Sequence, residues 1–190
     1  EKLFRLLVGS WRENWNDPDL PFYYVQLSSI DRPSWPWFRD SQRRLMDAIP
    51  HTGMAVSSDY GDSLDVHPKN KRPIGERLAH WALNRTYDKK QVVPSGPLFR
   101  SVDFREDAAY VSFDYADGLH TADGRPIREF EIAETEGVYY PAKAEVVGNQ
   151  VKVYSDRVKH PCHVRYAWRP FTRANLVNSQ SLPASTFRSR

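Results

Sequence analysis

Residues 21–27 read Pro-Phe-Tyr-Tyr-Val-Gln-Leu, a short run of aromatic and β-branched residues. Such a run is typical of a strand that is buried within a sheet. A second run of this kind, Gly53-Met-Ala-Val-Ser57, follows further along the chain. The two runs predict a sheet whose strands are covered by other elements.

Helical patterns surround these two strands. Apolar residues recur at helical spacing in residues 3–11, 38–49 and 74–82. Ser34 is a candidate N-cap for the second helix, and Pro73 opens the third. The residues expected on the inner faces are Leu3, Leu7, Trp11, Phe38, Ser41, Leu45, Ile49, Ile74, Leu78, Trp81 and Ala82. The order of elements predicts right-handed crossovers and a parallel sheet covered on both faces.

Residues 1–91 supply only two strands of such a sheet. Two parallel strands do not make a sheet of this class, because its layers need a continuous core. We therefore expect residues 1–91 to be the second half of a doubly wound α/β domain. The earlier strands would lie on another polypeptide or have been removed.

The pattern changes to period two from Val92 onward, which is typical of strands with one buried face. Gly148-Asn149 has the composition of a two-residue hairpin turn. Residues 92–190 are therefore predicted to form an antiparallel β-sandwich or jelly roll. The polar tail from Pro170 is either an ordered arm or loose. The alternating segments are Ala109-Val111-Phe113-Tyr115, Phe130-Ile132, Val151-Val153 and Val164-Tyr166-Trp168.

Composition limits the class of protein. The 190 residues are 40% hydrophobic and 13% aromatic, which is enough for a buried core and excludes wholesale disorder. The net charge of +3 comes from basic residues scattered among acidic ones, so no nucleic-acid partner is expected. No stretch approaches the roughly 18 apolar residues of a membrane span. The single cysteine, Cys162, excludes an internal disulfide, and no second ligand cluster completes a metal site with His160 and His163.

Residues with catalytic chemistry gather after the second strand, in Asp59-Tyr-Gly-Asp-Ser-Leu-Asp-Val-His67-Pro-Lys-Asn-Lys71. In open α/β sheets, catalytic groups collect beyond the carboxyl ends of the strands, where this loop would lie. His67 could act as a general base, with the carboxylate of Asp65 fixing its tautomer and stabilising the imidazolium. A solvated turn of the same composition is the alternative.

Two strings in the sequence match motifs of a large hydrolase superfamily. Gly61-Asp62-Ser63-Leu64 contains its GDSL string, but Ser63 follows a late strand and stands four residues before His67. No nucleophile elbow is evident there, so we interpret the match as coincidence. His120, in Asp117-Gly-Leu-His120, follows an alternating strand and is expected to be structural or exposed.

Other candidates allow a structural and a functional interpretation. Arg39 and Gln42, one helical turn apart, either brace the active-site loop or face water. Tryptophan side chains could stack on a sugar. Four of the six, however, lie on apolar stripes and are expected in the core, namely Trp11, Trp37, Trp81 and Trp168.

A set of motifs extends over nearly the whole chain: Trp11-Arg12, Leu20–Leu27, Arg39-x-x-Gln42, Thr52–Val56, Asp65–Lys71, Gly75–Ala79, Gly96-Pro97, Val164–Trp168, Asn175–Asn178 and Leu182–Ser185. In combination they resemble the sialate O-acetylesterase family of the SGNH hydrolase superfamily. The resemblance implies a flavodoxin-like catalytic domain joined to β-sandwich modules. It also implies cofactor-free hydrolysis of O-acetyl esters on sialic acids through a serine nucleophile. The implied location is secreted, periplasmic or lysosomal, with a signal peptide outside this sequence.

Position by position, His67 corresponds to the catalytic histidine of the family, and Asp65 is the best candidate for its acidic partner. The superfamily spacing places the aspartate three residues before the histidine, where this sequence has Leu64. Asp65, Asp62, Asp59 or a backbone carbonyl therefore remain as alternatives for orienting His67.

The family's serine lies in a Gly-Gln-Ser-Asn segment, and further glycine and asparagine blocks form its oxyanion hole; this sequence contains none of them. The resemblance therefore implies a C-terminal portion that lacks the nucleophile, with the N-terminal portion as partner. Two other hypotheses are an esterase for acetyl-xylan or another acetylated polysaccharide, and a non-catalytic carbohydrate-binding module.

Overall fold

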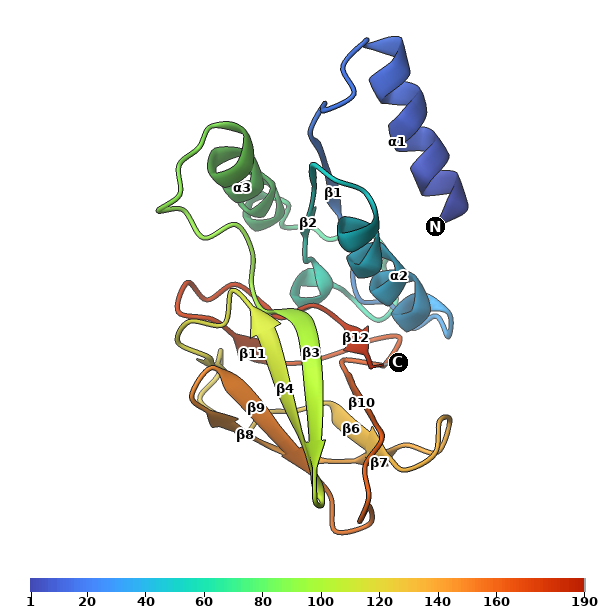
Figure 1. Ribbon diagram of the computed structural model, residues 1–190, viewed down its shortest axis with the longest axis vertical. Helices are drawn as coiled ribbons and strands as arrows, with labels where there is room; N and C mark the ends of the chain where they lie inside the picture. The colour runs from blue at the N-terminus through green and yellow to red at the C-terminus, as the bar shows by residue number, and fades with distance from the viewer. Residues whose placement is uncertain (190) are drawn as a thin grey trace.

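The computed structural model describes residues 1–189, and its first part follows the predicted order of elements (Figure 1). This part, the α/β region, consists of α1 (Lys2–Asn14), β1 (Phe22–Val25), α2 (Trp35–Ala48), β2 (Thr52–Ala55), the 3₁₀ turn η1 (Ser58–Tyr60), α3 (Arg72–Trp81) and the π-helical turn η2 (Ala82–Thr86). β1 and β2 pair in parallel, with Phe22 opposite Thr52 and Val25 opposite Ala55. Within residues 1–189, the predicted parallel sheet has two strands.

α3 packs closely on β2. Gly53 makes this possible, since a Cβ atom there would lie 2.5 Å from the Trp81 ring. The Trp81 Nε1 donates a hydrogen bond of 2.9 Å to the carbonyl of Met54. Ile74 and Trp81 are buried, as the helical periodicity predicts.

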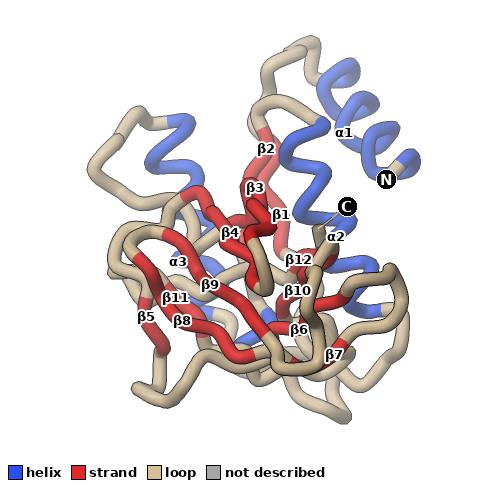
Figure 2. The backbone as a smooth tube through the Cα atoms, turned by 60° about the horizontal axis from the view of Figure 1, so that its bottom comes forward, coloured by secondary structure: helices blue, strands red, loops and turns tan. Residues whose placement is uncertain are grey.

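α1 covers the sheet with only part of its apolar surface. The Phe4 ring contacts those of Phe22 and Tyr24 edge to face, with centroids 5.7 and 4.8 Å apart. The residues expected to face inward are nevertheless exposed, namely Leu3, Leu7 and Trp11, the last at 49%. Figures 1 and 2 show that α1 lies at the periphery, so this side has no neighbour within the described residues.

α2 departs further from the prediction because it is buried on two faces. Leu45 and Ile49 are in the core as expected, whereas Trp37 and Phe38 are 52% and 56% exposed. A second buried face carries charged side chains instead, namely Arg39, Asp40 and Arg43. This face arises because α2 contacts both β2 and β12 (Phe187–Arg188), a strand formed near the C-terminus.

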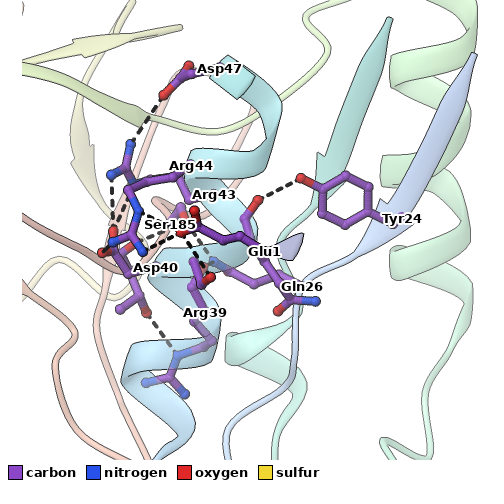
Figure 3. A network of polar contacts seen from close by, with 12 residues as sticks. Glu1, Tyr24, Gln26, Arg39, Asp40, Arg43, Arg44, Asp47 and Ser185 are labelled. Carbon is purple, nitrogen blue, oxygen red and sulfur yellow. Dashed lines mark hydrogen bonds and ion pairs between the residues drawn. The ribbon is translucent and has the colours of Figure 1, made fainter. Parts of the chain in front are cut away.

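Figure 3 shows the polar network that satisfies these charges. Asp40 accepts hydrogen bonds from Arg43, at 3.0 Å, and from Arg44. Arg44 also pairs with Glu1 at 2.6 Å, which ties the start of α1 to α2. A charged helix face can therefore be buried here because each charge has a partner.

The second part, called the antiparallel region, contains two four-stranded antiparallel sheets. The first has the order β3 (Leu98–Arg105), β4 (Ala108–Asp114), β9 (Gln150–Tyr154), β8 (Lys143–Val147). The second has the order β12 (Phe187–Arg188), β10 (His163–Tyr166), β6 (Phe130–Ala133), β7 (Tyr140–Pro141). A further pair joins β5 (His120–Thr121) and β11 (Leu176–Val177).

One hydrophobic core joins the two four-stranded sheets. It contains alternating residues of β4 and β9 from the first sheet and of β6, β10 and β12 from the second. The period-two prediction is thus confirmed for these segments, and the hairpin turn has Gly148 at φ +60° as expected. β3 was not predicted, because apolar and polar residues alternate poorly in its sequence, Leu-Phe-Arg-Ser-Val-Asp-Phe-Arg. The pairing of β3 with β4 accordingly shifts in register between Phe99 and Ser101.

Residues 170–189 of the tail are an ordered part of this region. Phe187 is fully buried and stacks on Phe99 with ring centroids 4.4 Å apart. The polarity of the tail reflects its bonds to buried backbone, since the Asn178 side-chain amide donates to the carbonyls of Ser95 and Tyr115. Among the helices of residues 1–189, none is long and apolar enough to cross a membrane.

Candidate functional site

The chain leaves the carboxyl end of β2 through η1 and enters the loop that carries the candidate catalytic residues. The His67 side chain is 82% exposed, so it lies at the surface, as a group that must meet a substrate should. Its Nδ1 lies 3.3 Å from Oδ1 of Asp65, and the same oxygen accepts a 2.8 Å hydrogen bond from the His67 backbone N–H. Nε2 is then the ring nitrogen left for a proton transfer.

Of the three aspartates considered as partners of His67, the structure brings only Asp65 to it. Asp62 accepts hydrogen bonds from the backbone N–H groups of Leu64 and Asp65, which closes a local turn. The hydrogen bond from the His67 backbone, followed by the contact with its ring, lowers the pKa of Asp65 below its usual value. Asp65 is therefore a carboxylate at neutral pH and can stabilise a protonated imidazole.

Asp59 has a different partner, Arg77 of α3. The two Nη atoms of Arg77 donate to the two carboxylate oxygens of Asp59 at 2.7 and 2.6 Å. Nη1 also donates to the carbonyl of Val56 at 2.7 Å, and the guanidinium lies over the Tyr60 ring. Arg77 thus fixes the first turn after β2, a role that the sequence analysis missed. The available signal was an arginine within the apolar face of the third helix.

The loop that follows β1 holds the catalytic loop from the other side. The backbone N–H of Asp31 donates to the carbonyl of Ser63 at 3.2 Å. Gly61 lies so close to Ser29 that a Cβ atom on it would be 2.3 Å from the Ser29 carbonyl oxygen. The two loops therefore interlock through backbone atoms, which leaves little freedom to shift one without the other.

Gly61→Ala is accordingly expected to displace the catalytic loop. Overpacking of this kind costs about 1–3 kcal/mol of stability, and a misplaced catalytic group can lower turnover by as much as about 100-fold. Gly75→Ala is the matched control, because a Cβ atom there meets nothing within 4 Å. Ester hydrolysis and melting temperature should be measured for both variants in the complete enzyme. Unchanged hydrolysis by Gly61→Ala would show that the contact does not position the loop.

The sequence left open whether Gln42 braces the active-site loop or faces water. In the structure its side chain binds the backbone of the strand that leads into this site. Its Nε2 donates to the carbonyl of Val25 at 3.2 Å, and its Oε1 accepts from the N–H of Leu27 at 2.8 Å. These backbone groups face away from β2, because the N–H of Gln26 donates to the carbonyl of Ala55. The amide of Gln42 therefore occupies part of the edge of β1 that no strand covers within residues 1–189.

The other candidate groups lie apart from this arrangement. Ser63 is exposed, and no hydrogen bond joins its hydroxyl to His67 within residues 1–189. His120 is exposed in β5, with Nδ1 2.9 Å from the carbonyl oxygen of Gly118. Cys162 is exposed and free. In the described part of the chain, no group of three or more His, Cys, Asp or Glu side chains could hold a metal ion.

Among the cavities lined by both the α/β region and the antiparallel region, two lie at opposite ends of the strands β1 and β2. The larger, of about 450 Å³, is lined by Pro21, His51 and Thr52, which mark the amino ends of β1 and β2. A cavity of about 150 Å³ is lined by Ser58 and Asp59 of η1, which follow the carboxyl end of β2. The smaller cavity therefore lies at the carboxyl ends of the strands, as the His67 loop does. The larger cavity lies at their amino ends.

Comparison with known proteins finds proteins that are similar to this chain. No protein-family model matches the chain. It is 22% identical over 218 residues to a sialate O-acetylesterase of Rattus norvegicus, which covers 99% of this chain and 40% of that protein. It also superposes on the crystal structure of a novel carbohydrate acetylesterase from Xanthomonas citri with a TM-score of 0.89 and 36% sequence identity, over 95% of this chain and 43% of that one. The resemblance to the sialate O-acetylesterase family is confirmed.

The chain spans about two fifths of the length of each of these relatives. The resemblance to the sialate O-acetylesterase family implies a catalytic role for His67 and makes Asp65 the best candidate for its acidic partner. The structure supplies their geometry, an exposed pair on the carboxyl edge of the sheet. Their catalytic roles stay a prediction.

Proposed function

We propose that this chain supplies the proton acceptor of a serine-dependent carbohydrate O-acetylesterase. The observation that carries the proposal is the exposed His67–Asp65 pair, held at 3.3 Å on the carboxyl edge of β2 in a chain similar to two acetylesterases. In this proposal His67 is the general base, and Asp65 orients it as a positioning residue. No cofactor is needed for this chemistry.

The proposed reaction has two halves. In the first, a serine oxygen attacks the acetyl carbonyl carbon while Nε2 of His67 takes the serine proton. The tetrahedral intermediate collapses as the sugar oxygen leaves with that proton, which yields the free hydroxyl and an acetyl-serine. In the second, His67 takes a proton from water, which attacks the acetyl-serine carbonyl. The acyl–oxygen bond then breaks, acetate leaves, and the serine oxygen takes the proton back from His67. Asp65 stabilises the imidazolium formed in each half.

We propose that the serine belongs to an N-terminal portion of the same enzyme. Two surfaces of the α/β region support this: the edge of β1 that no strand covers, and the exposed apolar side of α1. A parallel sheet needs cover on both faces, and exposed apolar patches commonly mark interaction surfaces. The exposed apolar residues on α1 and just after it are Leu3, Leu6, Leu7, Trp11 and Trp15. In this arrangement the chain contributes the second half of a flavodoxin-like domain together with a β-sandwich module.

The 190-residue chain alone is therefore expected to show no esterase activity, and addition of the N-terminal portion is expected to restore it. The test is an acetyl-ester assay on each portion and on the mixture. Robust turnover by the chain alone that Ser63→Ala abolishes would instead assign the nucleophile to Ser63. Glycan binding without activity in any reconstituted form would favour a non-catalytic carbohydrate-binding module.

The proposed substrate is an O-acetylated sialic acid, on the strength of the relative from Rattus norvegicus. The relative from Xanthomonas citri, named as a carbohydrate acetylesterase, supports an acetylated polysaccharide as the second candidate. Parallel assays of the complete enzyme on O-acetyl sialate and on acetyl-xylan separate the two. A secreted, periplasmic or lysosomal location would accord with either substrate.

A further inference from the structure

The cavity of about 150 Å³ beside the catalytic loop is built jointly by the two regions of the chain. Ser58 and Asp59 of η1 form one side, and Ala122, Asp123, Arg128 and residues 172–175 of the antiparallel region form the other. Small-molecule sites are typically concave places of this kind, where a few polar groups converge between two structural units.

The segment that carries Arg173 is fixed in this cavity by its backbone. Arg128 donates from Nε and Nη2 to the Arg173 carbonyl at 3.1 and 2.9 Å, and the Arg173 N–H donates to Glu129 at 2.8 Å. The N–H of the preceding residue, Thr172, donates to the Ser29 hydroxyl at 2.6 Å. Since Ser29 also packs against Gly61, the position of Arg173 is coupled directly to the loop that carries His67.

The side chain of Arg173 is by contrast free. It is exposed, lies over the Phe171 ring with 4.3 Å between Cζ and the ring centroid, and forms no ion pair or side-chain hydrogen bond within residues 1–189. The other charged groups of the cavity are already paired, Asp59 with Arg77 and Asp123 with Arg128. Its five N–H donors are therefore available to a ligand.

Asp123 supplies a complementary acceptor. Hydrogen bonds from Asn175, Arg128 and the backbone of Arg125 lower the pKa of Asp123 to about 2, so it is ionised at neutral pH. Oδ1 accepts from Asn175 and Arg125, whereas Oδ2 accepts only from Arg128 and keeps an acceptor position. A fixed carboxylate and a free guanidinium on one wall suit a group that both donates and accepts hydrogen bonds, as sugar hydroxyls do.

We propose that this cavity is the subsite for the sugar ring that bears the acetyl ester, with Arg173 as its principal contact. The proposal rests on the proposed esterase function and assigns the antiparallel region a direct part in substrate recognition. Arg173 is thus a specificity residue of the reaction rather than a group that handles its protons. A hydroxyl or a carboxylate of the sugar can accept from its guanidinium.

The test uses Arg173→Ala in the complete enzyme, with the glycan ester and the small ester p-nitrophenyl acetate as substrates. Loss of a hydrogen bond to a charged group predicts a rise in KM for the glycan ester of about 10-fold or more, with kcat near that of the unchanged enzyme, which is the signature of lost substrate binding. Hydrolysis of p-nitrophenyl acetate should not change, because this ester has no sugar. Arg173→Lys, which keeps the charge and loses the planar fork, should fall between the two.

Arg125→Ala is the matched control, since Arg125 is exposed nearby but does not line the cavity. An unchanged KM for the glycan ester in Arg173→Ala, or an equal loss with p-nitrophenyl acetate, would overturn the subsite. If His67→Ala retained full activity, the esterase proposal itself would fail. Loss of activity in His67→Ala together with no effect of Arg173→Ala would remove the subsite alone.

The same experiment on two glycans identifies the contact. A larger KM effect on O-acetyl sialate than on acetyl-xylan supports a contact between Arg173 and the sugar carboxylate. Equal effects on both support a contact between Arg173 and the uncharged ring hydroxyls. The cavity would then be a sugar subsite that does not depend on a carboxylate.

Discussion

His67→Ala is expected to lower kcat of the complete enzyme on an acetyl ester by about 10³–10⁴-fold or more, the range found for members of a catalytic triad. In the proposed mechanism the imidazole takes the nucleophile's proton, and it lies at the carboxyl edge with Nδ1 directed to Asp65. Because the side chain is 82% exposed, its removal should leave the melting temperature unchanged. Initial rates and thermal unfolding of the same preparation measure both quantities.

His120→Ala is the matched control, because it removes another exposed histidine, one that lies in the Asp-x-x-His string at residues 117–120. A comparison of Asp65→Asn with Asp62→Asn then tests the choice of partner. Asp65→Asn should lower kcat, since the amide cannot stabilise the imidazolium in the same way. Asp62→Asn should have a smaller effect through the local turn. Full activity of His67→Ala, or a larger loss in Asp62→Asn than in Asp65→Asn, would contradict this site.

The parts of the fold that were predicted from sequence are those determined by local pattern. Ile74 and Trp81 recur at helical spacing and are buried, and Val151 and Val153 alternate and are buried. The helix α2 was predicted, but the burial of its second face was not. This face is covered by β12, which lies about 140 residues further along the chain. Periodicity carries no information about a contact at that sequence separation.

The same distinction applies to the site. His67 and Asp65 are two residues apart, so their proximity follows from a short turn and was predicted. Arg77 reaches Asp59 across 18 residues and from another element. Its role could be inferred only once α3 was packed against β2. Trp37 was expected in the core and is instead 52% exposed, because its contacts with the Trp168 ring and the Arg188 guanidinium cover only part of it.

Arg39→Ala is expected to produce the largest loss of stability in this chain. Arg39 is fully buried and donates from α2 to four groups of the antiparallel region. These are the hydroxyl of Thr186 at 3.0 Å and the carbonyls of Pro170 at 3.0 Å, Ala167 at 3.1 Å and Arg169. Burial lowers its pKa to about 10, so it remains protonated at neutral pH, and four of its five N–H donors are in use.

The alanine variant would leave the carbonyls of Pro170 and Arg169 without this donor, and the carbonyl of Ala167 with only the Thr186 hydroxyl at 3.4 Å. Each unsatisfied buried group costs about 1–3 kcal/mol. For a chain of this size that loss lowers the melting temperature by on the order of 10 °C. Thermal and urea unfolding of the 190-residue chain measure it, with the exposed Arg32→Ala as control.

Arg39→Met separates the two contributions that alanine removes together. Methionine fills much of the same space with a flexible apolar chain but donates no hydrogen bond, so it restores packing and leaves the carbonyls unsatisfied. If hydrogen bonding between the regions dominates, Arg39→Met should lose nearly as much stability as Arg39→Ala. If volume dominates, the methionine variant should recover most of it. A loss below about 1 kcal/mol in Arg39→Ala, the scale of an ordinary substitution, would show that the contact between α2 and the C-terminal tail is held by its apolar neighbours rather than by this guanidinium.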